Sequence, residues 1–124
     1  MVFGKELILD LKDCKGEINN KDYLQLFVNE LLDKIKMKKI GKTIFSYFEP
    51  TEFNIKNDLV GFTVLQILSL SSLSIHICDI SRTMYINIFT CGDLIEETVI
   101  EIIHKYFQPI IINKQIIIRG TNVN

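Results

Sequence analysis

The sequence carries little net charge and has few cysteines. Its 124 residues have a formal charge of −1, with acidic and basic side chains interspersed and no charged tail. Because nucleic-acid binding needs a basic face, this balance gives no support for a nucleic-acid partner. The three cysteines, Cys14, Cys78 and Cys91, lack metal-ligand spacing. We therefore expect reduced thiols and no metal site.

Long hydrophobic runs are also missing. The longest mostly apolar run, residues 59–70, is interrupted by polar residues and is too short to span a bilayer. The first residues lack the basic start and the long apolar region of a signal peptide. The pattern predicts a cytoplasmic protein with no membrane partner.

Apolar residues are abundant, at 48% of the chain, which is typical of a globular protein. The length fits one domain over residues 1–124. Six stretches have strand-like composition and are bounded by turn residues. They cover residues 6–12, 43–48, 59–69, 73–78, 83–90 and 110–119, the last as a strand pair or as one strand bent around Asn113 and Lys114.

Two other stretches have apolar residues at three- and four-residue spacing, which predicts amphipathic helices. The first covers residues 20–38, with Asn19 or Asn20 as its N-cap. The second starts at Asp93, with Glu96 at capping-box distance. Each helix has one apolar stripe, so each should cover one sheet face. We expect an α+β fold, a two-layer sandwich of an antiparallel-rich sheet with two helices on one face.

Three chemically capable side chains lie close together in the sequence, within two predicted strands. Ser71, His76 and Cys91 supply a hydroxyl, a base near neutral pH and a thiol. By themselves they are also typical of a β-hairpin with polar residues on its solvent face, since no general catalytic motif fits them. In an ideal strand Ser71 and His76 point to opposite faces, so cooperation between them needs a bend near Ser71.

The same residues stand in a more specific pattern. The run S-x-L-S-I-H, residues 71–76, is followed fifteen residues after the histidine by the cysteine of F-T-C-G. This arrangement resembles the processing site and catalytic cysteine of the prokaryotic-type S-adenosylmethionine decarboxylase proenzyme family. Residues 4–14, G-K-E-L-I-L-D-L-K-D-C, are similar to that family's opening G-x-H-L-[IV]-x-[DE]-[LFY]-x-x-C. The resemblance covers nearly the whole chain.

The resemblance implies a self-cleaving proenzyme. The Ser71 hydroxyl would attack the carbonyl of Leu70, the chain would be cut between these two residues, and Ser71 would become a covalent pyruvoyl cofactor. The pyruvoyl carbonyl would bind the amine of S-adenosylmethionine as a Schiff base and withdraw electrons, so that carbon dioxide departs. The implied pathway is polyamine (spermidine) biosynthesis.

The resemblance also implies roles for other residues. His76 matches the processing histidine, and Thr63 matches the processing serine and keeps its hydroxyl. Cys91 matches the acid that reprotonates the substrate carbon. Phe48 matches the aromatic residue that stacks on adenine. The family further implies a homodimer with sites near its interface.

Three positions depart from the family pattern. Leu70 replaces a glutamate before the cleaved serine, Ile80 replaces the glutamate expected to bind the ribose hydroxyls, and the loop of residues 49–58 is longer than usual. These departures leave two alternatives open. One is a catalytically silent paralogue that binds or activates another subunit. The other is a pyruvoyl-dependent decarboxylase of a free amino acid such as ornithine or arginine.

Overall fold

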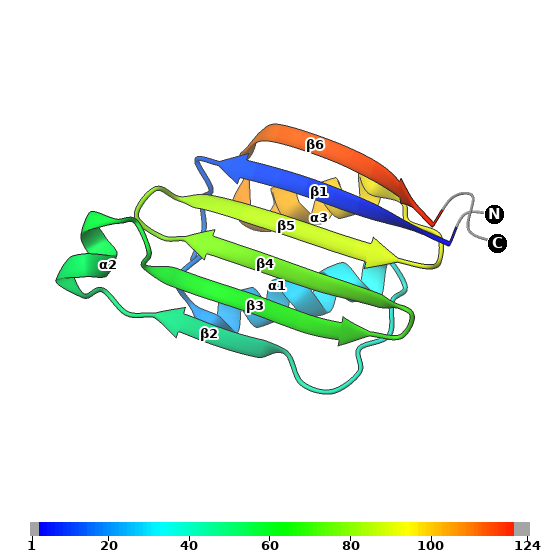
Figure 1. Cartoon of the computed structure of the whole chain (residues 1–124), viewed down its shortest axis with the longest axis horizontal. Coiled ribbons are helices and arrows are strands. Elements are labelled where there is room, and N and C mark those ends of the chain that lie inside the picture. Colours follow the sequence, from blue (N-terminus) through cyan, green and yellow to red (C-terminus); the bar gives the residue numbers. More distant parts are fainter. Residues whose placement is uncertain (1–2, 121–124) are drawn as a thin grey trace.

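The computed structural model describes residues 3–120 and shows a single sheet with helices behind it (Figure 1). The strands pair in the order β2-β3-β4-β5-β1-β6, and every neighbouring pair is antiparallel. The strands are β1 (Gly4–Lys12), β2 (Ile44–Phe48), β3 (Gly61–Leu68), β4 (Ser71–Cys78), β5 (Thr83–Thr90) and β6 (Ile110–Arg119).

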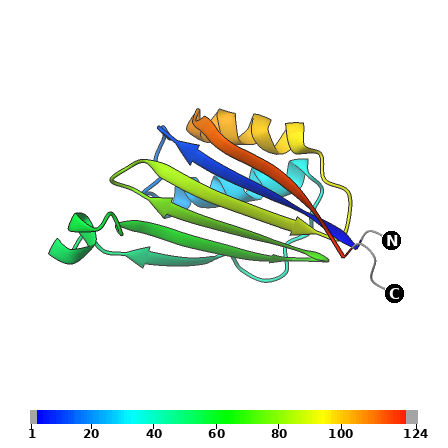
Figure 2. The same ribbon diagram turned by 45° about the horizontal axis from the view of Figure 1, so that its top comes forward.

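The two long helices, α1 (Lys21–Lys34) and α3 (Glu96–Phe107), lie on the same face of the sheet (Figure 2). The short helix α2 (Glu52–Lys56) lies apart from them, at one end of the sheet. The expected α+β two-layer sandwich is therefore confirmed, with α2 added. None of the helices in residues 3–120 is long and apolar enough to cross a membrane.

The core lies between the sheet and the two long helices because every second strand residue points toward them. Each such side chain, when fully buried, contributes about 1.5–3 kcal/mol of hydrophobic stabilisation. Completely or almost completely buried examples are Leu7, Leu9 and Leu11 of β1, Leu73, Ile75 and Ile77 of β4, Met84, Ile86 and Ile88 of β5, and Phe27 and Phe107 of the helices.

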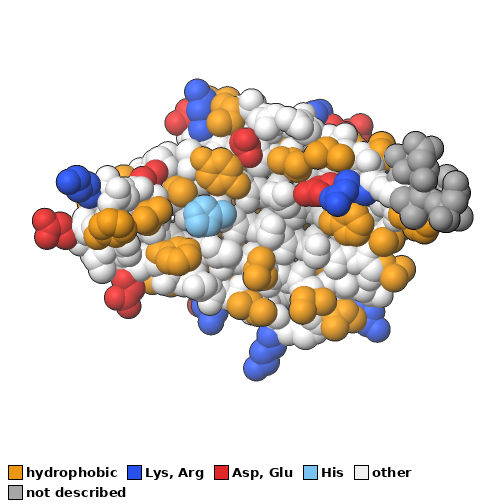
Figure 3. All heavy atoms as spheres, in the orientation of Figure 1, with side chains coloured by type: hydrophobic (Ala, Val, Ile, Leu, Met, Phe, Trp, Pro, Cys, Tyr) orange, Lys and Arg blue, Asp and Glu red, His pale blue; other side chains and the backbone are white. Residues whose placement is uncertain are grey.

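The opposite face of the sheet has no helix over it. Figure 3 shows this face, on which hydrophobic side chains are scattered among polar ones. Exposed apolar side chains on it include Leu65 and Ile67 of β3, Tyr85 of β5 and Ile117 of β6. We refer to this surface as the open face.

Helix α1 starts where the sequence predicts and ends earlier. The Asn20 side chain accepts hydrogen bonds from two N–H groups of the first turn, at 2.9 and 3.1 Å, which confirms it as the N-cap. The helix stops at Lys34 rather than at residue 38, because Lys36 has a left-handed backbone with φ of +58°. The chain then runs beside the start of the β3–β4 turn, where the Lys38 carbonyl accepts from the Ser69 N–H at 2.9 Å.

The predicted cap of the last helix is wrong. Helix α3 begins at Glu96 after Ile95, and no side chain accepts a hydrogen bond at this end. A capping box needs the Glu96 carboxylate to turn back toward the cap. Instead that carboxylate pairs with the Lys114 ammonium of β6 at 2.5 Å. Asp93 therefore precedes the helix by several residues.

Two other segments also differ from expectation. Residues 49–58 are not entirely a loop, since they contain α2, whose cap Thr51 accepts from the Asn54 N–H at 3.1 Å. The final segment is one strand, β6, rather than a strand pair. Its pairing with β1 skips Ile112, so the irregularity lies one residue before the expected bend at Asn113.

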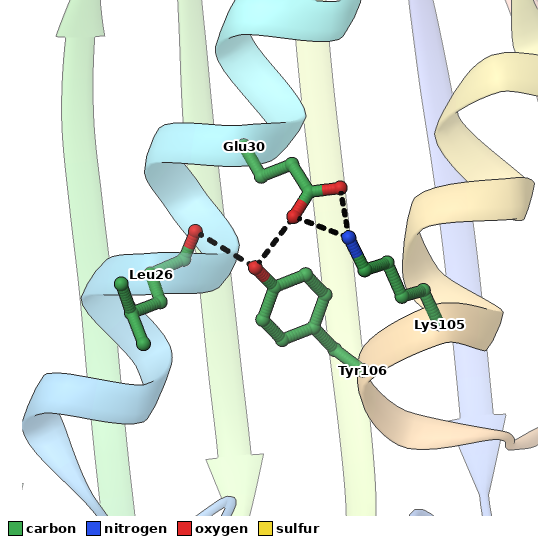
Figure 4. Close-up of polar contacts among 4 residues, drawn as sticks. All are labelled: Leu26, Glu30, Lys105 and Tyr106. Carbon is green, nitrogen blue, oxygen red and sulfur yellow. Dashed lines mark hydrogen bonds and ion pairs between the residues drawn. The ribbon is translucent and has the colours of Figure 1, made fainter.

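A polar network joins the two long helices on the side away from the sheet (Figure 4). The Lys105 ammonium of α3 donates to both carboxylate oxygens of Glu30 on α1, at 2.8 and 2.7 Å. The Tyr106 hydroxyl donates to the same carboxylate at 2.8 Å. These contacts lower the pKa of Glu30, and burial together with Glu30 raises the pKa of Tyr106 to about 12. The ionised Glu30 carboxylate therefore stabilises the packing of α1 against α3.

We expect Glu30→Gln to lower the thermal stability at neutral pH. Because the folded pKa of Glu30 lies below its unfolded value of about 4.3, its contribution is complete above that value and disappears as the pH falls through the folded pKa. Melting curves of both proteins between pH 7 and pH 3 should converge at the acidic end. Glu101→Gln, which removes an exposed carboxylate of α3, is the control. A stability difference that is the same at every pH would contradict the expectation.

Candidate active site

The turn between β3 and β4 holds the predicted cleavage position in a strained conformation. Leu68 pairs with Ser71, so only Ser69 and Leu70 form the turn. Leu70 has a φ of +62°, a left-handed conformation that costs a non-glycine residue about 1–2 kcal/mol. Its side chain is 74% exposed and has little packing to compensate. The bond before Ser71 therefore lies next to a strained, accessible residue.

The carbonyl at this position is hydrogen-bonded to the next strand. The Cys91 N–H, just after the end of β5, donates to the Leu70 carbonyl oxygen at 3.0 Å. A donor at this oxygen stabilises the negative charge that develops when a nucleophile attacks the carbonyl carbon. The donor is a backbone group, so its position depends on the pairing of β4 with β5.

The Ser71 hydroxyl points toward the helix side of the sheet. Its Oγ donates to Thr90 Oγ1 at 2.7 Å. Thr90 lies on the same face of β5 as the buried core residues of that strand. A cavity of about 280 Å³ adjoins this hydrogen bond. Its lining comes from the cleavage turn, from the end of β5 and from the chain after α1: Ser69, Leu70, Ser71, Thr90, Met37 and Lys38, among others.

Cys91 is the accessible thiol of the chain. It is exposed and lines a neighbouring cavity of about 430 Å³ together with Lys5 and Ile118. Burial raises the pKa of the Cys14 thiol to about 11 and also raises that of Cys78. Because the thiolate is the reactive form, these two cysteines are poor candidates for chemistry at neutral pH.

A second group of predicted residues lies together on the open face. Thr63 of β3 pairs directly with His76 of β4, and Thr63 Oγ1 is 3.0 Å from His76 Nδ1. The ring of Phe48 lies 6.2 Å from the imidazole ring, centroid to centroid. Phe48 and His76, with Asn54 and Leu59, line an apolar hollow of about 120 Å³. The hydrogen bond to Thr63 orients the imidazole beside this hollow.

The structure therefore divides the predicted site in two. We call Leu70, Ser71, Thr90 and Cys91 the cleavage cluster, and Phe48, Thr63 and His76 the histidine cluster. Strand β4 pairs regularly from Ser71 to Cys78, so there is no bend at Ser71. Ser71 and His76 lie on opposite faces, and five residues of strand separate them by about 16 Å. They do not meet within one chain.

Sequence comparison assigns the chain to a family. Residues 5–120 match the family described as S-adenosylmethionine decarboxylase. The chain belongs to the S-adenosylmethionine decarboxylase family. Among curated relatives, the S-adenosylmethionine decarboxylase proenzyme of Archaeoglobus fulgidus is 29% identical over 94 residues, which cover 75% of each chain.

A solved structure supports the fold of this family member. The crystal structure of the adenosylmethionine decarboxylase from Aquifex aeolicus is similar over 96% of this chain and 92% of that chain. The TM-score is 0.76 and the identity is 20%. At that identity the likeness establishes the architecture.

Two features of the site become clear only in the structure. Thr90, the partner of the Ser71 hydroxyl, was not among the predicted residues, although it directly precedes Cys91 in F-T-C-G. Ile80, at the position where the resemblance implies a glutamate, is exposed in the β4–β5 turn. The neighbouring Asp79 carboxylate lies 3.8 Å from the Arg82 guanidinium, so the nearest acid in this turn already has a cationic partner.

Proposed function

We propose that this family member is a self-processing, pyruvoyl-dependent decarboxylase of S-adenosylmethionine that acts in polyamine (spermidine) biosynthesis. The observation that carries the proposal is the strained Leu70–Ser71 junction, whose carbonyl and hydroxyl are both held by the end of β5. The Archaeoglobus fulgidus relative is named a proenzyme, which supports self-processing.

The cleavage chemistry uses groups of the chain itself. The Ser71 Oγ bonds to the carbonyl carbon of Leu70, the Leu70–Ser71 C–N bond breaks, and the hydroxyl proton ends on the freed amine. The Cys91 N–H stabilises the charge on the Leu70 oxygen. Loss of the Ser71 Cα proton then expels the Leu70 carboxylate by breaking the Cβ–Oγ bond. Water replaces the nitrogen, ammonia is released, and a pyruvoyl group blocks the fragment of residues 71–124.

The cleavage cluster fits a pyruvoyl group at position 71. That position borders a cavity of about 280 Å³, and cutting the turn frees it from the β3–β4 connection. The group supplies an electron-withdrawing carbonyl that accepts the electrons released on decarboxylation. In this proposal the exposed Cys91 thiol donates the proton that replaces carbon dioxide, and the Phe48 ring stacks on the adenine.

The proposal includes a homodimer, because Thr63 and His76 are too far from Ser71 of their own chain to assist it. In the proposed dimer a two-fold axis packs the open faces together and brings the histidine cluster of one copy to the end of the sheet where Leu70 and Cys91 of the other copy are exposed. His76 would reach the cleavage turn around this end, because the Ser71 hydroxyl itself points to the helix side. The exposed apolar side chains of the open face support this packing, since their burial favours association (Figure 3).

The dimer can be tested by complementation. We expect chains carrying His76→Ala to stay uncut alone and to be cut when co-expressed with Ser71→Ala chains, because the mixed dimer contains one site with both groups. Intact-mass analysis identifies which chain is cut, and sedimentation measures the association. In the control mixture His76→Ala chains are co-expressed with chains that carry both Ser71→Ala and His76→Ala, so that no site contains both groups and no chain should be cut. A monomer at micromolar concentration would contradict the dimer.

Two alternative functions have specific support. Leu70 and Ile80 both alter the functional pattern and leave the core unchanged, as expected for a silent paralogue that binds or activates another subunit. A carboxylate at position 80 would bind the ribose hydroxyls of a nucleoside substrate. A free amino acid has no ribose, so the absence of this carboxylate at Ile80 matters less for such a substrate. This observation favours a pyruvoyl-dependent decarboxylase of ornithine or arginine as the other alternative.

One experiment separates these functions. We expect intact-mass analysis to show fragments of residues 1–70 and 71–124, and purified protein to release carbon dioxide from S-adenosylmethionine. Release from ornithine or arginine instead would identify the amino-acid enzyme. If the chain is uncut, Leu70→Glu restores the residue found in the family. Cutting of this variant would indicate slow processing, whereas an uncut variant would favour the silent paralogue.

A further inference from the structure

Thr90 is an unusual residue in the core. Of the described residues, Thr90 and Gln66 are the buried polar side chains, and Thr90 is 2% exposed. It ends β5 on the helix side of the sheet, directly opposite Ser71 in the register. A valine of the same shape would fill this position without a polar atom, so packing alone does not require a hydroxyl here.

The hydroxyl of Thr90 is held from two sides. Its Oγ1 accepts from the Ser71 hydroxyl at 2.7 Å and from the Gly92 N–H at 2.9 Å. A hydroxyl oxygen has two acceptor sites, so both are occupied. The β-branched side chain is also stiff about χ1. Thr90 is therefore a fixed acceptor rather than a group that follows Ser71.

A fixed acceptor orients the nucleophile. Because the Ser71 hydroxyl proton points at Thr90, the lone pairs of the Ser71 oxygen remain free to attack an electrophile. The Leu70 carbonyl precedes this residue and accepts from the Cys91 N–H at 3.0 Å. Consecutive residues at the end of β5 thus hold both reacting groups of the cleavage turn, the hydroxyl through Thr90 and the carbonyl through Cys91.

The geometry points to Thr90 as a positioning residue for self-cleavage, which orients the Ser71 hydroxyl toward the Leu70 carbonyl. This inference rests on the proposed function. Thr90 is not the base, since a hydroxyl has no basicity at neutral pH. The Ser71 Oγ–C bond forms, the Leu70–Ser71 C–N bond breaks, and the serine proton ends on the freed amine. The proposed role of Thr90 is exerted on the Ser71 hydroxyl, before the pyruvoyl group exists.

The test compares Thr90→Val, Thr90→Ala and Thr90→Ser during cell-free synthesis, with cleavage followed by intact mass. We expect Thr90→Val and Thr90→Ala to be cut about tenfold more slowly, the scale of one lost hydrogen bond, and Thr90→Ser to retain most of the rate. Thr83→Val, which removes a hydroxyl from the other end of β5, is the matched control and should be cut normally. Melting temperatures show which variants are folded at the assay temperature.

A second measurement separates positioning from a structural role. Once cut, Thr90→Val should lose much less turnover of S-adenosylmethionine per pyruvoyl group than it loses in cleavage rate. Cleavage of Thr90→Val and Thr90→Ala at the wild-type rate would overturn the role of Thr90 while leaving the proposed function intact. The role of Thr90 would also be overturned if the turnover rate per pyruvoyl group fell in Thr90→Val by as large a factor as the cleavage rate. A wild-type chain that is never cut would overturn the proposed function itself, and this inference with it.

Discussion

Replacement of Ser71 by alanine should abolish both self-cleavage and decarboxylation while the protein remains folded. The substitution removes the hydroxyl oxygen that forms the ester. Without this oxygen there is no carboxylate leaving group on Cβ, so the elimination that leads to the pyruvoyl group cannot occur. It also removes the hydrogen bond to Thr90, at a cost of about 1–2 kcal/mol that the apolar core can absorb. Intact-mass analysis should show one full-length chain, and carbon dioxide release should fall to the level without enzyme.

The neighbouring serine provides a matched control. Ser72 lies on the open face, is exposed and differs from Ser71 by one position in β4. Ser72→Ala should therefore be cut and should turn over substrate like the wild type. If Ser71→Ala retained full decarboxylase activity, the pyruvoyl proposal would be wrong, because this chain would then be using another electron sink.

Replacement of Cys91 by alanine should separate cleavage from turnover. The group of Cys91 that contacts the cleavage turn is its backbone N–H, which alanine keeps. We therefore expect cleavage to proceed at least in part. The thiol is lost, so decarboxylation should fall by about 10²–10⁴-fold, the usual effect of removing a positioned acid.

The control for this variant is Cys78→Ala, which removes a partly buried thiol whose pKa is raised by burial. It should be cut and should remain active. Wild-type turnover by Cys91→Ala would exclude its thiol as the acid. A completely uncut Cys91→Ala chain would instead mean that the thiol, and not only the N–H, takes part in cleavage.

Much of the fold follows from local patterns in the sequence. Strand-like composition bounded by turn residues identified the six strands, and helical spacing identified both long helices, because burial of one helix face follows the helical period. The end of α1 and the start of α3 were misplaced. The left-handed backbone of Lys36 ends α1, and the ion pair of Glu96 with Lys114 displaces the capping box. The Glu96 pair involves a residue distant in sequence, which local patterns do not register.

The sequence alone determined that Ser71 and His76 point to opposite faces, since a strand alternates whatever its surroundings. It also determined the grouping of candidate residues, through their resemblance to a family motif. Only the tertiary structure decided which residues meet. Strand register places Thr90 and the Cys91 N–H against the cleavage turn and Thr63 against His76, so that the candidate residues form two clusters. Register depends on the pairing of all the strands and on the core beneath them, and no short stretch of sequence contains that information.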